Sequence, residues 1–136
     1  MPSKKSRQRT KGRREAGHYV QVPTELLKHP NYAELLPIEV KLFFDLYGQY
    51  NGFNNGDFTA AWKIMEKLGW KSKSQLYKAL KGLVGKGFIV LTRQGGRNKC
   101  SLYGVTFQSI DECKGKLDHP ETQTALGWWK TGEPQY

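Results

Sequence analysis

Residues 70–107 show a change in the spacing of apolar positions, from helical to strand-like. After Ser72, apolar residues recur every three or four positions, which places them on one stripe of an α-helix. Ser72 and Gln75 match a capping box, S-x-x-Q, so we expect this helix to begin near Lys73. Gly87 is suited to end it, because glycine adopts the left-handed conformation at little cost. The stripe consists of Leu76, Ala79, Leu80, Leu83 and Val84.

Two glycines lie inside this expected helix. Gly82 and Gly85 each cost up to about 1 kcal/mol relative to alanine in a helix interior. Two interpretations are open: the glycines allow a backbone or partner to approach closely, or they mark fraying of the last turn.

Two β-prone runs follow the helix. FIVLTRQ (88–94) and CSLYGVTF (100–107) are rich in β-branched and aromatic residues. The intervening GGRNK contains Gly95 and Gly96, which permit a tight turn. We therefore expect a hairpin whose tip is surrounded by Arg93, Arg97, Asn98 and Lys99.

Two further helices are expected before this region. LPIEVKLFFDLYGQY (36–50) places Pro37 at a first helical position and is apolar over most of its surface, so it belongs in the core. AAWKIMEKLGW (60–70) predicts a second helix ending at Gly69. The short interval from Gly69 to Ser72 gives the spacing of a helix-turn-helix. The inward residues expected in the second helix are Trp62, Ile64, Met65 and Leu68.

Shorter elements are predicted around these helices. HYVQVP (18–23) alternates enough for a short strand. Thr24 is placed to cap a brief helix that runs to Lys28, before Pro30 interrupts it. GDF (56–58) predicts a small strand ahead of the second helix.

Composition and charge indicate what kind of molecule this domain binds. The 136 residues suffice for one domain, and the aromatic content of 12% argues against general disorder. The net charge is +10. Residues 1–16 hold seven Lys/Arg and one Glu, and residues 63–99 hold ten and one, whereas the rest of the chain is slightly acidic. A basic excess confined to two segments indicates a polyanion-facing surface.

The two ends of the chain are expected to differ in character. Residues 1–17 have almost no apolar side chains and predict a disordered arm, either a nucleic-acid tether or a solvated tail. Residues 111–136 predict an irregular tail, in which Trp128 and Trp129 either dock on the domain or contact a protein partner or a second copy of the chain. The basic residues of the arm are Lys4, Lys5, Arg7, Arg9, Lys11, Arg13 and Arg14.

Other classes of chemistry find little support. No secretory signal is recognisable, so Cys100 and Cys113 are expected to be reduced thiols of a cytoplasmic protein. Their spacing matches no zinc motif, and we expect neither a metal nor a cofactor. No run of eighteen apolar residues indicates a membrane span. The sequence shows no nucleophile–histidine pair, metal-ligand carboxylate pattern or phosphate-binding glycine loop, which argues against an enzyme.

Residues 36–107 resemble a winged helix-turn-helix domain, in the order helix, short strand, helix, recognition helix and wing. The run from NNGDF to KCSLY is similar to small helix-turn-helix proteins of bacterial phages and mobile elements, and to the winged-helix part of phage and plasmid replication proteins. The resemblance implies an α+β fold with a single domain over 18–110, built from three main helices and a β-hairpin wing. It also implies double-stranded DNA binding, with the helix 72–84 in the major groove and the turn 94–99 against phosphates or the minor groove. We expect no second winged-helix, ATPase or ligand-binding domain within these residues, and this departure from the family argues against a complete initiator or a small-molecule sensor.

Candidate DNA contacts follow from side-chain chemistry on these elements. Early, outward residues of a recognition helix must reach base edges, whereas contacts to phosphate position the protein without specifying sequence. Gln75 has two alternatives, an adenine contact or the capping box. Arg97 is suited to a narrow minor groove or a phosphate. The base-edge candidates are Lys73, Ser74, Gln75, Tyr77 and Lys78, beside the cap Ser72; the phosphate candidates are Lys71, Lys81 and Lys86; and the wing candidates are Arg93, Arg97, Asn98 and Lys99.

Three functions are compatible with the sequence. The favoured one is a double-stranded DNA-binding protein of a phage or mobile element, associated with the bacterial nucleoid, that acts as a transcriptional regulator or a replication-origin accessory. The first alternative is a winged helix that grips or inhibits a host protein without DNA. The second is an RNA-binding protein, for which the basic arm is expected but the helix-turn-helix is not.

Overall fold

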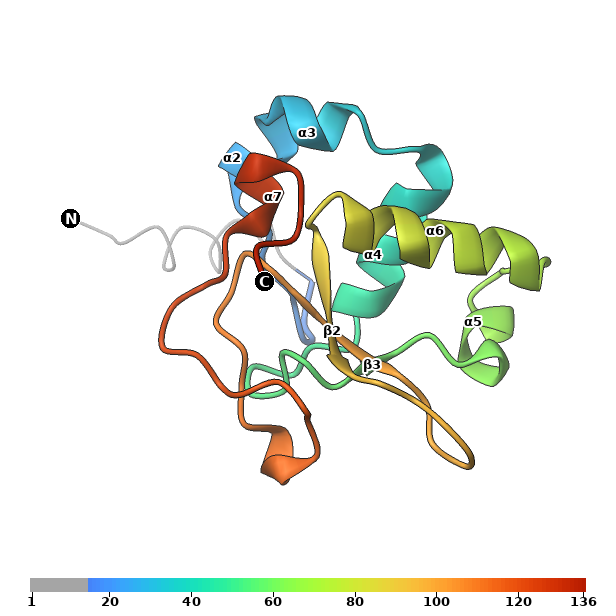
Figure 1. Ribbon diagram of the computed structural model, residues 1–136. Helices are drawn as coiled ribbons and strands as arrows, with labels where there is room; N and C mark the ends of the chain where they lie inside the picture. The colour runs from blue at the N-terminus through green and yellow to red at the C-terminus, as the bar shows by residue number, and fades with distance from the viewer. Residues whose placement is uncertain (1–14) are drawn as a thin grey trace.

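The computed structural model describes residues 15–136 as an α+β fold (Figure 1). This part of the chain contains six α-helices, one 3-10 turn and a three-stranded antiparallel sheet. The arm candidates from Lys4 to Arg14 lie outside the described residues. None of the helices in the described part is both long enough and apolar enough to cross a membrane.

The helices follow local start and stop signals. Pro37 occupies the first turn of α4, where its missing N–H costs nothing. Gly87, at φ 79°, lies just beyond α6 and ends it in the left-handed conformation. The elements are α2 (Thr24–Lys28), α3 (Pro30–Ala33), α4 (Pro37–Tyr47), α5 (Trp62–Lys67), α6 (Lys73–Gly85), η1 (Cys113–Gly115) and α7 (Trp128–Thr131).

The sheet has the order β1-β3-β2, with β3 in the centre. Its strands are β1 (Phe58–Thr59), β2 (Ile89–Arg93) and β3 (Leu102–Val105). The register of β2 against β3 shifts between Leu91 and Arg93, which forms a bulge at Thr92. The Thr92 hydroxyl donates to the carbonyl of Gly56, and its own carbonyl accepts from the backbone of Asp118 and His119. The bulge therefore ties the sheet to two other parts of the chain.

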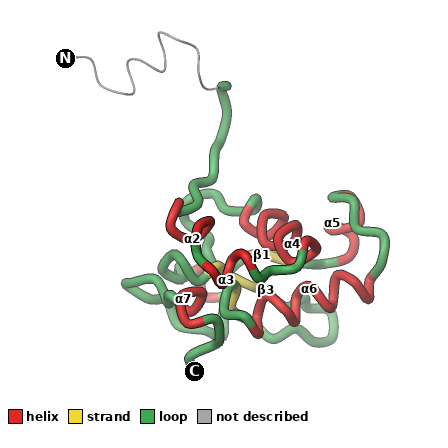
Figure 2. Tube along the Cα trace, turned by 90° about the horizontal axis from the view of Figure 1, so that it is seen from above, coloured by secondary structure: helices red, strands yellow, loops and turns green. Residues whose placement is uncertain are grey.

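The main core lies between α4, α6 and the sheet, where Figure 2 shows the two helices beside the strands. Phe43 and Tyr47 of α4 are fully buried, as are Leu83 of α6 and Phe88. The ring of Phe43 meets that of Phe88 edge to face, with centroids 6.0 Å apart. This packing sets the position of α6 relative to the hairpin.

Several sequence predictions are wrong in detail. Residues 18–23 form no strand, and the carbonyl of Gln21 instead accepts a hydrogen bond from the Tyr47 hydroxyl. Thr24 is the first residue of α2 rather than its cap, a position that Pro23 holds. Ile64 of α5 and Leu68 just after it are about two-fifths exposed, because a helix of six residues is too short to bury a wide stripe. The buried residues of this region are Met65 and Trp70.

The segment 111–136 packs on the rest of the domain. Trp128 and Trp129 are 6% and 4% exposed. The side chain of Asn31 donates to the carbonyl of Trp129, at 2.9 Å, and the N–H of Gly127 donates to the carbonyl of Thr106, at 2.7 Å. In Figure 1 this brings α7 beside α2 and α3. The two indoles are therefore used in contacts within this chain.

Candidate nucleic-acid interface

The turn between α5 and α6 is held against α4 by hydrogen bonds. Gly69 reverses the chain at φ 99°, a conformation that favours glycine. The Asp45 carboxylate accepts from the Trp70 indole N–H at 2.8 Å and from the Lys41 ammonium at 2.9 Å. Lys41 also donates to the carbonyl of Leu68 at 2.8 Å. These contacts fix the angle at which α6 leaves the turn.

The first turn of α6 is capped from one side. The Ser72 hydroxyl accepts the backbone N–H of Gln75 at 3.3 Å, as half of a capping box. The structure records no hydrogen bond from the Gln75 side chain to any of the residues 15–136. Gln75 is exposed, so its amide is available to a partner.

An ion pair with a buried carboxylate lies at the end of α6, on the side that faces α4. The carboxylate of Glu39, whose side chain is 3% exposed, lies 2.6 Å from the ammonium of Lys86 and also accepts the N–H of Leu36. It occupies the space beside Gly82, where an added Cβ would overlap it. Lys86, a predicted phosphate contact, is thus already paired with Glu39, and Gly82 permits the close approach of the carboxylate. Gly85 has no neighbour within 4 Å of an added Cβ.

Seven of the sequence candidates share the exposed side of α6 and the turn before it. Tyr77 is 61% exposed, and the Lys81 ammonium lies 5.4 Å from its ring centroid. The Lys73 ammonium lies 5.7 Å from the ring of Trp62. Both distances fit cation–π contacts, which orient a lysine without neutralising it. The exposed candidates are Lys71, Lys73, Ser74, Gln75, Tyr77, Lys78 and Lys81, beside the half-buried cap Ser72.

The hairpin residues predicted to contact DNA differ in how exposed they are. The guanidinium of Arg93 is half-buried and donates to the carbonyl of Cys100 at 2.7 Å, which braces the hairpin. Gly96 and Lys99 pair across the tip, so Arg97 and Asn98 form the turn, with Asn98 at φ 60°. Asparagine tolerates this conformation better than most residues. Arg97, Asn98 and Lys99 are exposed, whereas Arg93 acts mainly within the hairpin.

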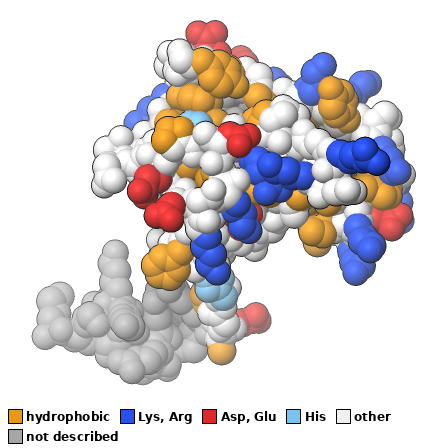
Figure 3. Space-filling view, turned by 60° about the horizontal axis from the view of Figure 1, so that its bottom comes forward, with side chains coloured by type: hydrophobic (Ala, Val, Ile, Leu, Met, Phe, Trp, Pro, Cys, Tyr) orange, Lys and Arg blue, Asp and Glu red, His pale blue; other side chains and the backbone are white. Residues whose placement is uncertain are grey.

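The basic side chains of this region lack acidic partners. Of the ten Lys and Arg in residues 63–99, only Lys86 forms an ion pair within the described residues 15–136. Many of the Lys and Arg side chains in Figure 3 lie on its right-hand half, the half that holds α5, α6 and the hairpin tip in Figure 1. Lys63 and Lys67 of α5 are also exposed there and were not among the sequence candidates. A surface with this much uncompensated charge attracts polyanions.

Titratable groups elsewhere show burial effects rather than a reactive centre. Burial raises the pKa of the Cys113 thiol to about 11, and the carboxylates of Asp57 and Asp111 add to the rise. Burial also raises the pKa of Tyr47, Tyr50 and Tyr103. Cys100 is exposed, and both cysteines are free thiols. Within residues 15–136, no group of three or more His, Cys, Asp or Glu is arranged to hold a metal ion.

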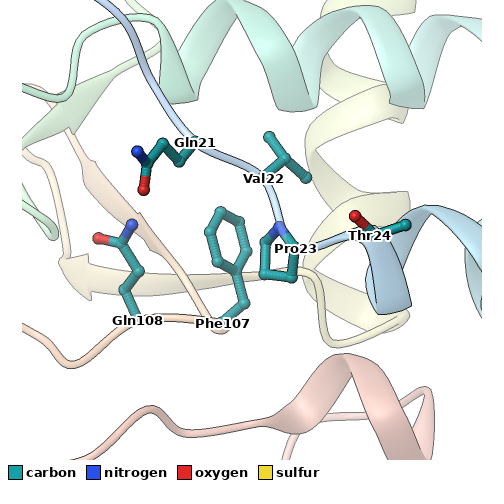
Figure 4. Close-up of a pocket in the computed structure, with 6 residues that line it drawn as sticks. All are labelled: Gln21, Val22, Pro23, Thr24, Phe107 and Gln108. Carbon is teal, nitrogen blue, oxygen red and sulfur yellow. The ribbon is translucent and has the colours of Figure 1, made fainter. Parts of the chain in front are cut away.

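Residues 15–136 form several surface hollows, of which two differ clearly in the chemistry of their lining. One, of about 580 Å³, lies between residues 21–24 and the pair Phe107 and Gln108 (Figure 4). It contains no charged side chain, and the Gln108 amide is already bonded to the Tyr47 hydroxyl at 2.6 Å. This hollow therefore offers neither catalytic groups nor electrostatic attraction for a ligand.

The second hollow, which we call the tyrosine groove, separates α6 from the hairpin and has a volume of about 420 Å³. The sequence alone did not indicate this groove, although Tyr103 of β3 and Ser101 just before the strand alternate with the buried Leu102 and thus share one side of the hairpin. Nothing in the sequence points to Tyr136. The apolar lining consists of Tyr77, Leu80 and Val84 of α6, Leu91 and Tyr103 of the hairpin, and Tyr136.

Comparisons with known proteins provide no relative from which the role of this interface could be inferred. No protein-family model matches the chain, and neither a search of curated proteins nor a search of solved structures finds a match.

Proposed function

We propose that this chain is a double-stranded DNA-binding protein with a winged helix-turn-helix arrangement. In this proposal α6 is the recognition helix in the major groove and the β2–β3 hairpin is the wing. The observation that carries the proposal is the set of exposed, unpaired Lys and Arg on α5, α6 and the hairpin tip. The order α4, β1, α5, α6, β2, β3 supports it, since a winged helix has the same order of elements.

The exposed residues divide by chemistry. Lys73, Ser74 and Gln75 lie in the first turn of α6, from which a recognition helix usually reads base edges. The free amide of Gln75 can form two hydrogen bonds with adenine. Lys78 lies one turn further on and is also a base-edge candidate, whereas Lys81 lies where contact with phosphates fixes orientation without specifying sequence.

The wing and the N-terminal segment extend the contact. Arg97 at the hairpin tip can enter a narrow minor groove or bind a phosphate with two N–H groups. Basic residues 4–14 would add electrostatic attraction that does not depend on sequence. The proposed role is positioning at a promoter or a replication origin of a phage or mobile element, with no chemical step.

A salt titration tests the proposal. Affinity for a random-sequence duplex is expected to fall with salt, with a log–log slope of roughly −4 to −7 for about four to eight phosphate contacts. Lys78→Glu with Lys81→Glu should weaken duplex binding at least about tenfold, because each glutamate replaces attraction with repulsion. The matched control is Lys28→Glu with Lys114→Glu, which makes the same charge change at exposed sites outside residues 63–99.

Two results would contradict the proposal. If the wild-type chain does not bind duplex DNA at low salt, the domain does not have this function, and the protein-binding alternative becomes the leading one. If the two double variants lose equal affinity while their far-UV circular dichroism is native, net charge rather than α6 is responsible for binding.

A further inference from the structure

We propose that the tyrosine groove binds a nucleobase displaced from the DNA stack, so that this protein prefers DNA containing an unpaired base over a regular duplex. The inference rests on the proposed DNA-binding function and specifies its substrate. Its starting point is the position of the groove, which runs between the two elements that carry the unpaired cations.

The lining of the groove is apolar and aromatic. Tyr77 and Tyr136 are 61% and 94% exposed, and Tyr103 of β3 is half-buried in the same lining. The indole of Trp128 meets the ring of Tyr136 with centroids 5.5 Å apart, which places the tyrosine beside α7. The volume of about 420 Å³ falls in the range of small-molecule sites, roughly 300–1,000 Å³. Planar rings therefore have both the space and the π surfaces needed to stack there.

A regular duplex cannot use such a surface. Its grooves present phosphates, sugars and base edges, while the faces of the bases are covered by their stacked neighbours. Aromatic side chains gain base-stacking energy only from bases that have left the stack. An exposed aromatic groove on a DNA-binding side thus favours a displaced base over a paired one.

The charge around the groove matches a nucleotide rather than a hydrophobic peptide. No Asp or Glu is among the described residues that line it. Lys81 lies at its wall and keeps its ammonium 5.4 Å from the ring of Tyr77. Arg97 and Lys99 are exposed at the hairpin tip. A displaced base remains attached to two phosphates, which these cations attract, whereas an apolar peptide gains nothing from them.

Polar groups in the groove can bind the edge of a base. The Ser101 hydroxyl accepts the N–H of Gly95 at 2.9 Å and is also hydrogen-bonded to the Tyr103 phenol, so the two hydroxyls form one polar edge of the groove. The Tyr103 phenol is protonated at neutral pH, as any tyrosine is, and burial raises its pKa further. Gln94 also lines the groove and carries an amide. These groups provide donors and acceptors without selecting one base.

Three DNA probes test the proposal with the full chain: a duplex, the same duplex with one bulged thymidine, and the same bulge with the base removed. Stacking of one base on aromatic side chains contributes about 1–3 kcal/mol, so the thymidine bulge should bind about 5- to 150-fold more tightly than the duplex. The bulge without a base should lose this gain, because it keeps the flexibility of the DNA but offers no ring.

Substitutions of the groove tyrosines test whether the tighter binding of the bulge depends on the groove. Tyr103→Leu and Tyr136→Ala each remove one ring and should reduce the preference for the bulge by at least about fivefold. Tyr136→Ala changes an exposed side chain and leaves the core intact, so it guards against a folding defect in Tyr103→Leu. Phe53→Ala is the control, since Phe53 is an 83% exposed aromatic residue that does not line the groove.

The possible failures are distinguishable. Equal affinity for all three probes overturns the groove proposal and leaves duplex binding intact, whereas no binding to any probe overturns both. Equal affinity for the bulge with a base and the bulge without one would show that the preference comes from DNA flexibility, which overturns the groove proposal. If Tyr103→Leu and Tyr136→Ala both keep the preference for the bulged duplex, the groove proposal is also overturned. A dimer in light scattering that Tyr136→Ala dissociates would assign the groove to a second copy of the chain.

Discussion

Among single residues, Glu39 links α4 directly to the C-terminal end of α6. Its carboxylate is buried at the contact between α4 and α6, where it accepts from Leu36 and pairs with Lys86. A buried charge is tolerated only when it is paired and hydrogen-bonded, and removal of one partner leaves the other unsatisfied. Gly82 makes this arrangement possible, because any side chain there would occupy the space of the carboxylate.

Gly82→Ala is expected to destabilise the fold. Although alanine is the better helix former, its Cβ would displace the Glu39 carboxylate from Leu36 and Lys86. Overpacking of this kind costs about 1–3 kcal/mol. The free energy of unfolding, measured by urea denaturation, should fall by that amount.

Gly85→Ala is the matched control for this prediction. Position 85 lies in the last turn of the same helix, and an added Cβ there meets nothing within 4 Å. The substitution should leave the free energy of unfolding unchanged or raise it by up to about 1 kcal/mol. If the two variants change stability equally, the Glu39 contact does not govern position 82.

At the scale of elements, the orientation of α6 depends on the turn that precedes it. The helix α5 has only six residues and buries little beyond Met65, so it cannot hold the turn by packing alone. Asp45 compensates for this by accepting from Trp70 and Lys41, and Lys41 reaches the carbonyl of Leu68. The polar contacts of α4 therefore place the surface on which the DNA-binding proposal depends.

Asp45→Ala should loosen this turn. It leaves the indole N–H of Trp70 without its acceptor in a site that is 4% exposed, at a cost of about 1–3 kcal/mol. Asp45→Asn retains an acceptor oxygen and should cost less. Thermal or urea denaturation followed by circular dichroism gives both values.

A surface ion pair provides the comparison. Asp57 lies 2.9 Å from Lys116, and both side chains are partly exposed. Asp57→Ala should therefore cost only about 0–1 kcal/mol. A loss for Asp45→Ala no larger than that for Asp57→Ala would show that the Asp45–Trp70 bond does not hold the turn.

Across the whole molecule, the C-terminal segment closes the fold. Trp129 joins the main core, while Trp128 packs with Val90 and Ile110 in a second apolar cluster behind β2. The backbone bonds of Asp118 and His119 to Thr92 add to this closure. Since the segment supplies two buried indoles, we expect it to unfold together with the domain rather than before it.

Coincident unfolding transitions would support this expectation. The chain has four tryptophans, so Trp62→Phe with Trp70→Phe leaves only Trp128 and Trp129 to fluoresce. The urea midpoints from fluorescence and from far-UV circular dichroism should then agree, as they do for a two-state domain.

The complementary variant, Trp128→Phe with Trp129→Phe, reports on the helical core and serves as the control. If residues 111–136 were a separate unit, the fluorescence of Trp128 and Trp129 would change at lower urea than the circular dichroism. That result would contradict a single cooperative domain.

Local signals in the sequence determined the main helices and the hairpin. The cap at Ser72, the proline at position 37 and the glycines at 69 and 87 act over a few residues, and each has the predicted role in the structure. Helical and alternating periodicity likewise act over short distances. The α+β class, the bounds of α6 and the exposure of most α6 candidates could therefore be predicted from the chain alone.

Only the tertiary structure decided which residues meet across long separations. Glu39 and Lys86 are 47 positions apart, and Asn31 and Trp129 are 98 apart. No local pattern encodes such pairings, because they depend on how the elements pack. The same packing removed Lys86 from the set of free cations, explained Gly82, buried Trp129 and brought Tyr136 to a groove beside α6.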